Sequence, residues 1–116
     1  MTVKQVRDWG QVDDHACQRS AKVLELVGRR WSSGILLALA RGAERFVDIV
    51  ALVKGLSGRM LAVRLRELET AGLVNRVVVP TMPVTVRYQL TPQGRDLLAA
   101  LQPIARYAQR WEPPPD

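Results

Sequence analysis

The side chains best suited to recognition chemistry are three closely spaced arginines, Arg59, Arg64 and Arg66. A guanidinium is planar and always charged, and it can donate paired hydrogen bonds to the O6 and N7 atoms of guanine or to a phosphate. Arginines at this spacing favour a polyanionic partner, provided that they lie on a helix with one free face.

The segment from Ser57 to Ala71 has the pattern of such a helix. Ser57 can accept a hydrogen bond from a free amide of the first turn, and Gly72 can end the last turn. A narrow apolar stripe, suited to a protein core, consists of Leu61, Leu65 and Leu68. The pattern predicts one buried face and one exposed face.

The side opposite the stripe is the candidate reading surface. At about 100° per residue it carries Arg59, Val63 and Arg66. Met60 lies on one flank, and Arg64 lies on the same flank, nearer to the core, from where it could reach a phosphate. Val63 or Met60 can meet a thymine methyl group. The contacts that we predict for this helix are Ser57, Arg59, Met60, Val63, Arg64 and Arg66.

These arginines can also be interpreted as an ordinary solvated helix face. Glu67 and Glu69 follow at helical distances that allow them to pair with the arginines and partly neutralise them. The helix alone leaves both interpretations open, so the choice between them depends on the other predicted elements.

Catalytic and metal-binding residues are scarce. The chain has a single histidine, His15, and a single cysteine, Cys17. This pair lacks the third, orienting group of a nucleophilic site, and it can neither complete a tetrahedral zinc site nor form an intramolecular disulfide. We expect no enzyme, no metal site and no cofactor, and a reducing, cytoplasmic setting.

Membrane targeting is not expected either. The first residues lack the apolar run of a signal peptide, and no stretch reaches the roughly 18 apolar residues of a bilayer span. The net charge of +6 and the pI near 10.4 fit a polyanionic partner, although many basic proteins bind none.

Three further helices are expected ahead of the arginine helix. Apolar residues at spacings of three and four predict helices over roughly 17–28 and 31–40, with Gly28 as a C-cap and Ser32 or Ser33 near the second start. A short third helix follows from Phe46 to Val53. The first 15 residues show no period and are expected to be a flexible arm.

A β-hairpin is expected after the arginine helix. Val84, Val86, Tyr88 and Leu90 alternate with polar residues, and the β-branched run from Leu73 to Val79 can pair with them. The link at 80–83 contains two prolines and forms the tip. Phosphate or minor-groove contacts from this hairpin would extend the footprint of the helix, and the candidates are Arg76, Thr81 and Arg87.

The last helix is expected to pack against another helix. Thr91 followed by Pro92 is a helix start, Pro103 should kink the helix, and the prolines at 113–115 should end it. Apolar residues recur at intervals of four and three, which is typical of a helix-packing seam, and they are Leu97, Leu101, Ile104, Ala108 and Trp111.

These elements together predict an α+β winged helix-turn-helix. In this fold a recognition helix enters the major groove beside a two-stranded hairpin wing. The organisation that we expect is a flexible arm over 1–15, one domain over 16–111, and a proline-rich tail over 112–116.

The sequence resembles the HxlR family of winged-helix regulators, which are relatives of the MarR group. The resemblance spans roughly residues 16–111. It rests on GRRWS from Gly28, on Arg45 and Phe46, on GLSGRMLAVRLRELETAGLVNR from Gly55, and on VRYQLTPQGRDL from Val86.

The resemblance implies a cytoplasmic homodimer in which flanking N- and C-terminal dimerisation helices pack against those of the other subunit. Such a dimer binds double-stranded DNA at a near-palindromic site and regulates nearby genes in response to a chemical signal. Two recognition helices would lie about 34 Å apart. We expect a repressor rather than an activator. The alternative is a winged helix that contacts RNA or protein, because a fold does not fix a function.

Cys17 is the candidate sensor that the resemblance suggests. Several members of the family sense oxidants, quinones or aldehydes through a cysteine just before the first family helix, and Cys17 lies near that position, although its distance from Gly28 is one residue longer. The alternatives are an inert, partly buried thiol, or a small-molecule inducer bound near Trp31 and Tyr107 or Trp111.

Overall fold

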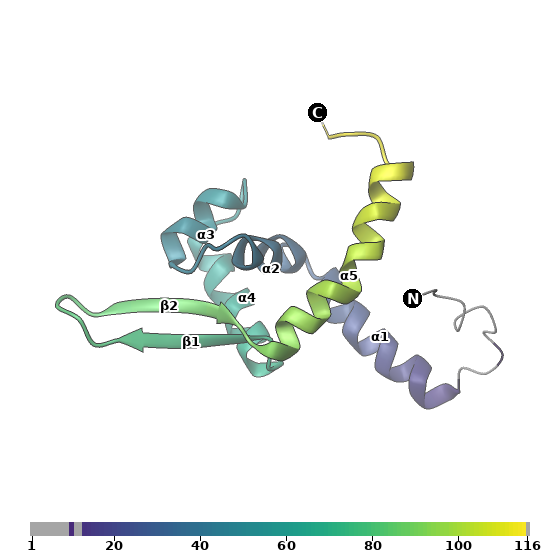
Figure 1. Cartoon of the computed structure of the whole chain (residues 1–116), viewed down its shortest axis with the longest axis horizontal. Coiled ribbons are helices and arrows are strands. Elements are labelled where there is room, and N and C mark those ends of the chain that lie inside the picture. The colour runs from purple at the N-terminus through teal and green to yellow at the C-terminus, as the bar shows by residue number, and fades with distance from the viewer. Residues whose placement is uncertain (1–9, 11–12, 116) are drawn as a thin grey trace.

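The computed structural model describes residues 10 and 13–115, which form five α-helices and one antiparallel hairpin. In Figure 1 the hairpin projects from one end of the molecule, and α1 and α5 project from the other. The predicted α+β order is confirmed. The elements are α1 (Asp14–Gly28), α2 (Ser32–Ala40), α3 (Phe46–Leu52), α4 (Gly58–Thr70), β1 (Val74–Val79), β2 (Thr85–Leu90) and α5 (Pro92–Trp111).

The core lies where α2, α3 and α4 meet. α2 is almost wholly apolar and buries both Ile35 and Leu36 completely, while α3 contributes the buried Ile49. The predicted stripe of α4 closes this core, and its exposed fractions are 0% for Leu61, 1% for Leu65 and 0% for Leu68. One face of α4 is therefore fixed against the core, as the spacing predicts.

Local signals set both ends of α4. The Ser57 hydroxyl accepts a hydrogen bond from the backbone N–H of Met60 at 3.1 Å, which caps the first turn. After the last turn, Gly72 adopts the left-handed conformation with φ of 81°, which costs a residue without a Cβ little. The chain then turns directly into β1.

The hairpin pairs Val74 with Leu90 at its base and Val79 with Thr85 near its tip. Val86, Tyr88 and Leu90 are partly buried on one face, while Arg87 and Gln89 are exposed on the other, so the predicted alternation is confirmed. Val84 is an exception, because it lies before the strand and is 60% exposed.

The start of α5 is joined tightly to the end of α4. The Thr91 hydroxyl donates a hydrogen bond to the Gly72 carbonyl at 2.6 Å and accepts one from the Gly94 N–H at 3.0 Å. The Thr91 backbone N–H donates to the Leu73 carbonyl at 3.0 Å. Since Thr91 is the only residue between β2 and α5, the hairpin and the last helix share one junction.

The start of α1 differs from the expected one, whereas the start of α2 agrees with the prediction. α1 begins at Asp14, because Asp13 caps it by accepting a hydrogen bond from the Ala16 N–H at 2.7 Å. The end of the predicted arm is therefore helical, and the rest of the arm, residues 1–9 and 11–12, lies outside the described residues. α2 begins at Ser32, so the predicted start near this serine is confirmed, and its N-cap is Trp31, which has a left-handed φ of 81°.

Pro103 lies within α5, as expected. It supplies no backbone N–H for the helix, and a proline at such a position bends a helix. Figure 1 shows α5 changing direction near its middle, in agreement with the predicted kink.

Replacing Gly94 by alanine should destabilise the protein. A Cβ at this position would collide with the backbone carbonyl oxygen of Leu73, which the Thr91 N–H already holds in place. We expect a loss of about 1–3 kcal/mol in the free energy of unfolding, measured by urea denaturation at fixed protein concentration. Gly28→Ala is the control, because its Cβ would meet nothing within 4 Å. Equal losses in the two variants would contradict this account of the junction.

Replacing Ser57 by alanine should remove the cap of α4 and cost about 1 kcal/mol in the same measurement. Ser33→Ala is the matched control, because Ser33 is exposed on α2 and its hydroxyl makes no hydrogen bond within the described residues. Ser57→Gly should cost less than Ser57→Ala, since glycine is itself tolerated at an N-cap. A fully stable Ser57→Ala protein would show that the hydrogen bond contributes nothing.

Candidate nucleic-acid interface

The outer face of α4 presents the arginines that the spacing predicts. Arg59 and Arg66 are exposed, and neither forms an ion pair or a side-chain hydrogen bond among the described residues. Val63 lies between them and is 43% exposed. Two free guanidiniums flank an accessible apolar side chain, so this face can donate hydrogen bonds and can contact a methyl group.

Two other predicted residues of α4 lie closer to the protein. Met60 is partly buried and packs against the core, so less of it is available to a partner than of Val63. Ser57 is exposed, but its hydroxyl already accepts the capping hydrogen bond of α4. Its O–H can still donate to a phosphate, because a hydroxyl donates and accepts at once.

Arg64 differs most from its predicted role. Its side chain is only 16% exposed, and its Nε donates a hydrogen bond to the backbone carbonyl of Arg30 at 2.8 Å. Its Nη1 pairs with Glu67 at 3.0 Å. The guanidinium therefore links α4 to the loop between α1 and α2, a geometry that does not favour the predicted phosphate contact.

Glu67 lies at the centre of this link. One carboxylate oxygen pairs with Arg64, and the other pairs with Arg29 at 2.9 Å. The ion pair between Glu67 and Arg29 could not be read from the sequence, because the two residues are 38 positions apart and no periodicity relates them. The predicted neutralisation of arginines by Glu67 thus applies to Arg64, while Arg59 and Arg66 stay free.

The two wing arginines lie on opposite faces of the hairpin. Arg76 is opposite Tyr88 in the register, and Arg87 is opposite Val77, so the alternation of a strand sends them to different sides. Both are exposed, but Arg87 pairs with Glu44 at 3.1 Å. They cannot contact the same phosphate, which the sequence prediction had not distinguished.

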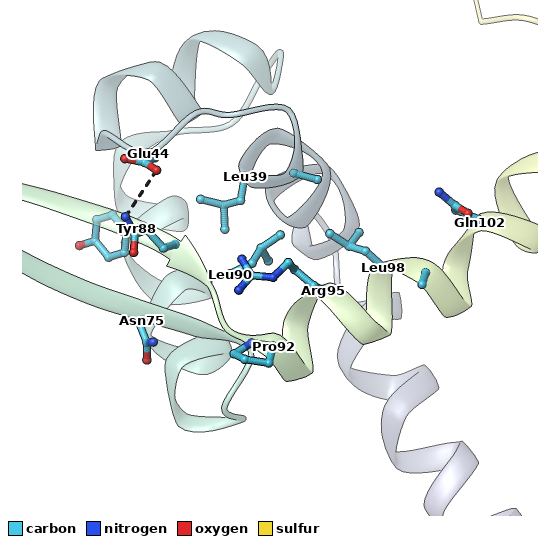
Figure 2. Close-up of a pocket in the computed structure, with 12 residues that line it drawn as sticks. Leu39, Glu44, Asn75, Tyr88, Leu90, Pro92, Arg95, Leu98 and Gln102 are labelled. Carbon is cyan, nitrogen blue, oxygen red and sulfur yellow. Dashed lines mark hydrogen bonds between the residues drawn. The ribbon is translucent and has the colours of Figure 1, made fainter.

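Glu44 fixes the base of the wing to the loop between α2 and α3. Its carbonyl oxygen accepts a hydrogen bond from the backbone N–H of Tyr88 at 2.7 Å (Figure 2). Its carboxylate accepts a weak hydrogen bond from Gln89 at 3.5 Å in addition to the Arg87 pair. Sequence reasoning missed this residue, because its partners lie more than 40 positions away, as the separation of 43 from Arg87 shows.

The wing tip is exposed. The Thr81 hydroxyl donates a hydrogen bond to the Pro83 carbonyl at 2.8 Å and lies 3.2 Å from the Thr85 hydroxyl. Thr81 thus orders the tip, whether or not it also meets a partner. Met82 beside it is 99% exposed, so the tip presents an apolar side chain to whatever the wing approaches.

A cavity of about 650 Å³ lies beside the base of the wing, between α2, β2 and α5 (Figure 2). Leu39, Leu90 and Leu98 form its apolar wall, and Glu44 and Arg95 bring opposite charges to it. The volume is in the range of small-molecule pockets. This cavity is not the inducer site predicted near Trp31 and Tyr107 or Trp111. Trp31 packs on the core, and the side chains of Tyr107 and Trp111 are 59% and 65% exposed.

Cys17 lies inside the first turns of α1 rather than before the helix, and it is exposed. The predicted partial burial of an inert thiol is therefore wrong for the single chain. His15 is also exposed. Within residues 10 and 13–115, no three His, Cys, Asp or Glu residues gather as metal ligands, and no helix is long and apolar enough to cross a membrane.

α1 and α5 expose apolar side chains that nothing in the described chain covers. α1 has no buried residue, and its Leu24 is 59% exposed. In the predicted seam, Leu97 packs on the core, Leu101 and Ala108 are partly buried, and Ile104 is 54% exposed. The seam therefore turns from the core toward solvent along the helix.

Comparison with known proteins agrees with this geometry. Residues 26–116 match the family described as HxlR-like helix-turn-helix. The chain is 40% identical over 98 residues to the uncharacterized HTH-type transcriptional regulator YvaP of Bacillus subtilis, covering 84% of this chain and 91% of that protein. It is 37% identical over 100 residues to the HTH-type transcriptional regulator YodB of the same organism, covering 86% and 89%.

Solved structures show the same fold. The reduced form of YodB from B. subtilis has a TM-score of 0.77 at 37% identity and covers 86% of this chain and 98% of that one. The redox regulator HypR in its reduced form has a TM-score of 0.73 at 28% identity, covering 79% and 91%. The winged helix-turn-helix is thereby confirmed, and the chain belongs to the HxlR-like helix-turn-helix family of DNA-binding transcriptional regulators.

Proposed function

We propose that this regulator is a cytoplasmic homodimeric repressor that binds a near-palindromic operator and is released by a chemical signal. The observation that carries the proposal is the division of α4 into a buried leucine stripe and a free face with Arg59, Val63 and Arg66. This face can enter a major groove while the wing approaches the neighbouring backbone.

The charge distribution supports separate roles for these arginines. Arg59 and Arg66 have no acidic partner in the described chain, so a DNA contact would not have to break an ion pair. Arg87 keeps further N–H groups beyond its pair with Glu44, and these can donate to a phosphate. We assign base reading to Arg59 and Arg66, and backbone contacts to Ser57, Arg76, Thr81 and Arg87.

The exposed apolar side chains of α1 and α5 support the dimer. Val23 and Leu24 on α1, and Ile104 and Trp111 on α5, are each more than 40% exposed in the single chain, at 44%, 59%, 54% and 65%. A second copy of the chain would bury such surface, and a two-fold axis would give two reading helices about one DNA turn apart.

The signal that we favour is oxidation or alkylation at Cys17. The thiol is exposed on α1, and solved relatives include diamide-treated and quinone-bound YodB and HypR in its oxidized form. The second candidate is a small-molecule inducer in the cavity beside the wing, which the volume of about 650 Å³ favours. A ligand there would lie against Glu44, which holds the wing.

DNA binding by this chain should depend on Arg59 in a sequence-selective way. Arg59→Ala should cost about 1–3 kcal/mol at one base position of the preferred duplex, whereas Arg87→Ala should weaken all duplexes alike. The measurement is fluorescence anisotropy on the DNA upstream of the gene and on a shuffled duplex, from about 50 to 200 mM salt.

The control is Arg110→Ala, which makes the same charge change at an exposed arginine in the last turn of α5. Equal losses from Arg59→Ala and Arg87→Ala on every sequence would contradict the assigned roles. If the wild-type protein binds neither duplex, the winged helix contacts protein or RNA instead.

Diamide should release the protein from its preferred duplex only when Cys17 is present. Diamide takes two electrons and two protons from two thiols, so two Cys17 residues would form an intersubunit disulfide while the reagent becomes the hydrazine. We expect a covalent dimer on a non-reducing gel and loss of DNA binding, both restored by dithiothreitol. Cys17→Ser should bind DNA normally and ignore diamide. Release of the serine variant as well would reject Cys17 as the sensor.

A further inference from the structure

We propose that Glu67, together with Arg64, is a positioning residue that sets the distance and angle between the two reading helices of the dimer. The inference rests on the proposed function, because it assumes a DNA-binding dimer. It concerns side chains on the flank of α4 that would meet no base, and it starts from the contacts that join α4 to the loop between α1 and α2.

Two polar contacts join the middle of α4 to that loop, and a third, within α4, links the two side chains that make them. The Glu67 carboxylate accepts a hydrogen bond from Arg29 at 2.9 Å and another from Arg64 at 3.0 Å. The Arg64 side chain also donates a hydrogen bond to the backbone carbonyl of Arg30 at 2.8 Å. The Arg64 side chain is 16% exposed and that of Glu67 is 30% exposed, so their contact is partly shielded from solvent, whereas Arg29, which is 51% exposed, pairs with Glu67 at the surface. A carboxylate shared by two guanidiniums also fixes the directions of both.

The loop has a defined shape of its own. Trp31 has a positive φ of 81°. Its ring packs against Gly55, so closely that a Cβ added to this glycine would lie 3.3 Å from the ring. The Arg30 guanidinium lies over the same ring at 4.6 Å from its centre. An L-residue adopts this conformation only when its surroundings hold it. The contacts of the Trp31 ring with Gly55 and Arg30 therefore support the shape of the loop that leads from α1 to α2.

Other contacts fix the far end of α4. Gly72, two residues after the helix, accepts a hydrogen bond from the Thr91 hydroxyl at 2.6 Å, and the Ala71 carbonyl accepts one from Gln93 at 3.3 Å. The middle of α4 is thus joined to the end of α1, and the end of α4 is joined to the start of α5. Since α1 and α5 carry the exposed apolar surface of the proposed dimer, these two connections add to the packing of the leucine stripe in placing α4 relative to the two-fold axis.

The charge of Glu67 is the strongest sign of a positioning role. A carboxylate on the recognition helix repels phosphates, and of the two carboxylates of α4 it is Glu67, and not Glu69, that is paired within the described residues. Here its charge is offset by two arginines, and it separates Arg64, which faces inward, from Arg66, which stays free on the outer face. A neutral side chain would remove the repulsion and also release the loop.

The test is the preference of the protein for one spacing between half-sites. A duplex is first selected by the wild-type protein from a random pool, and its two half-sites are then moved apart or together by one and two base pairs. We expect Glu67→Gln to reduce the preference for the best spacing by about threefold to tenfold, while affinity for a duplex with a single half-site does not fall.

Glu69→Gln is the matched control, since it makes the same charge change on the same helix at a residue with no side-chain partner within the described residues. It should raise the affinity for all spacings together and leave the preference unchanged. Arg29→Gln should loosen the preference as Glu67→Gln does, and the double variant should add little, because both remove the same contact.

An unchanged spacing preference in folded Glu67→Gln would overturn the inference, as would an equal change in Glu69→Gln. Loss of binding to the single half-site would also overturn it, because Glu67 would then serve the reading face itself. If the wild-type protein selects no duplex, the proposed function fails and the inference fails with it. If the selected duplex has a single half-site, the proposal of DNA binding is supported, whereas the proposed dimeric arrangement and this inference are rejected.

Discussion

Burial of the leucine stripe of α4 is the constraint from which the rest of the interface follows. Leu61, Leu65 and Leu68 are at most 1% exposed, and burying a leucine side chain contributes about 1.5–3 kcal/mol. α4 cannot rotate about its axis without exposing this stripe. The outward direction of Arg59 and Arg66 is therefore set by the core and not by any contact that the arginines make.

The same helix uses arginine in two physically different ways. Arg64 lies close enough to the core to give its hydrogen bonds to Glu67 and to a backbone carbonyl, so its charge serves the protein. Arg59 and Arg66, which point away from the core, keep their charges for a partner. The three arginines are chemically identical, and their positions around the helix axis decide their roles. Arg64 stabilises the protein, whereas Arg59 and Arg66 remain available to a partner.

Much of this arrangement could be predicted from the sequence, because it depends on local signals. The stripe, the Ser57 cap, the Thr91 cap and the alternation of β2 act over a few residues, and each lies where the pattern predicts. The residues that were missed or assigned another role make long-range contacts, such as Glu44 with Arg87 and Glu67 with Arg29. Charged side chains on a surface have many available partners, and only the folded chain selects one.

The single-residue junction at Thr91 determines where the chain can change its length. β2 ends at Leu90 and α5 begins at Pro92, while the hydrogen bonds of Thr91 tie this point to Gly72 and Leu73. An inserted residue here would separate Thr91 from these partners or move the start of α5, so the apolar seam of the helix would no longer face its present neighbours. The wing tip at 80–84 carries no such tie to the core, so insertions and deletions should accumulate there. In this fold the reach of the wing is free to vary, whereas the direction of the last helix is not.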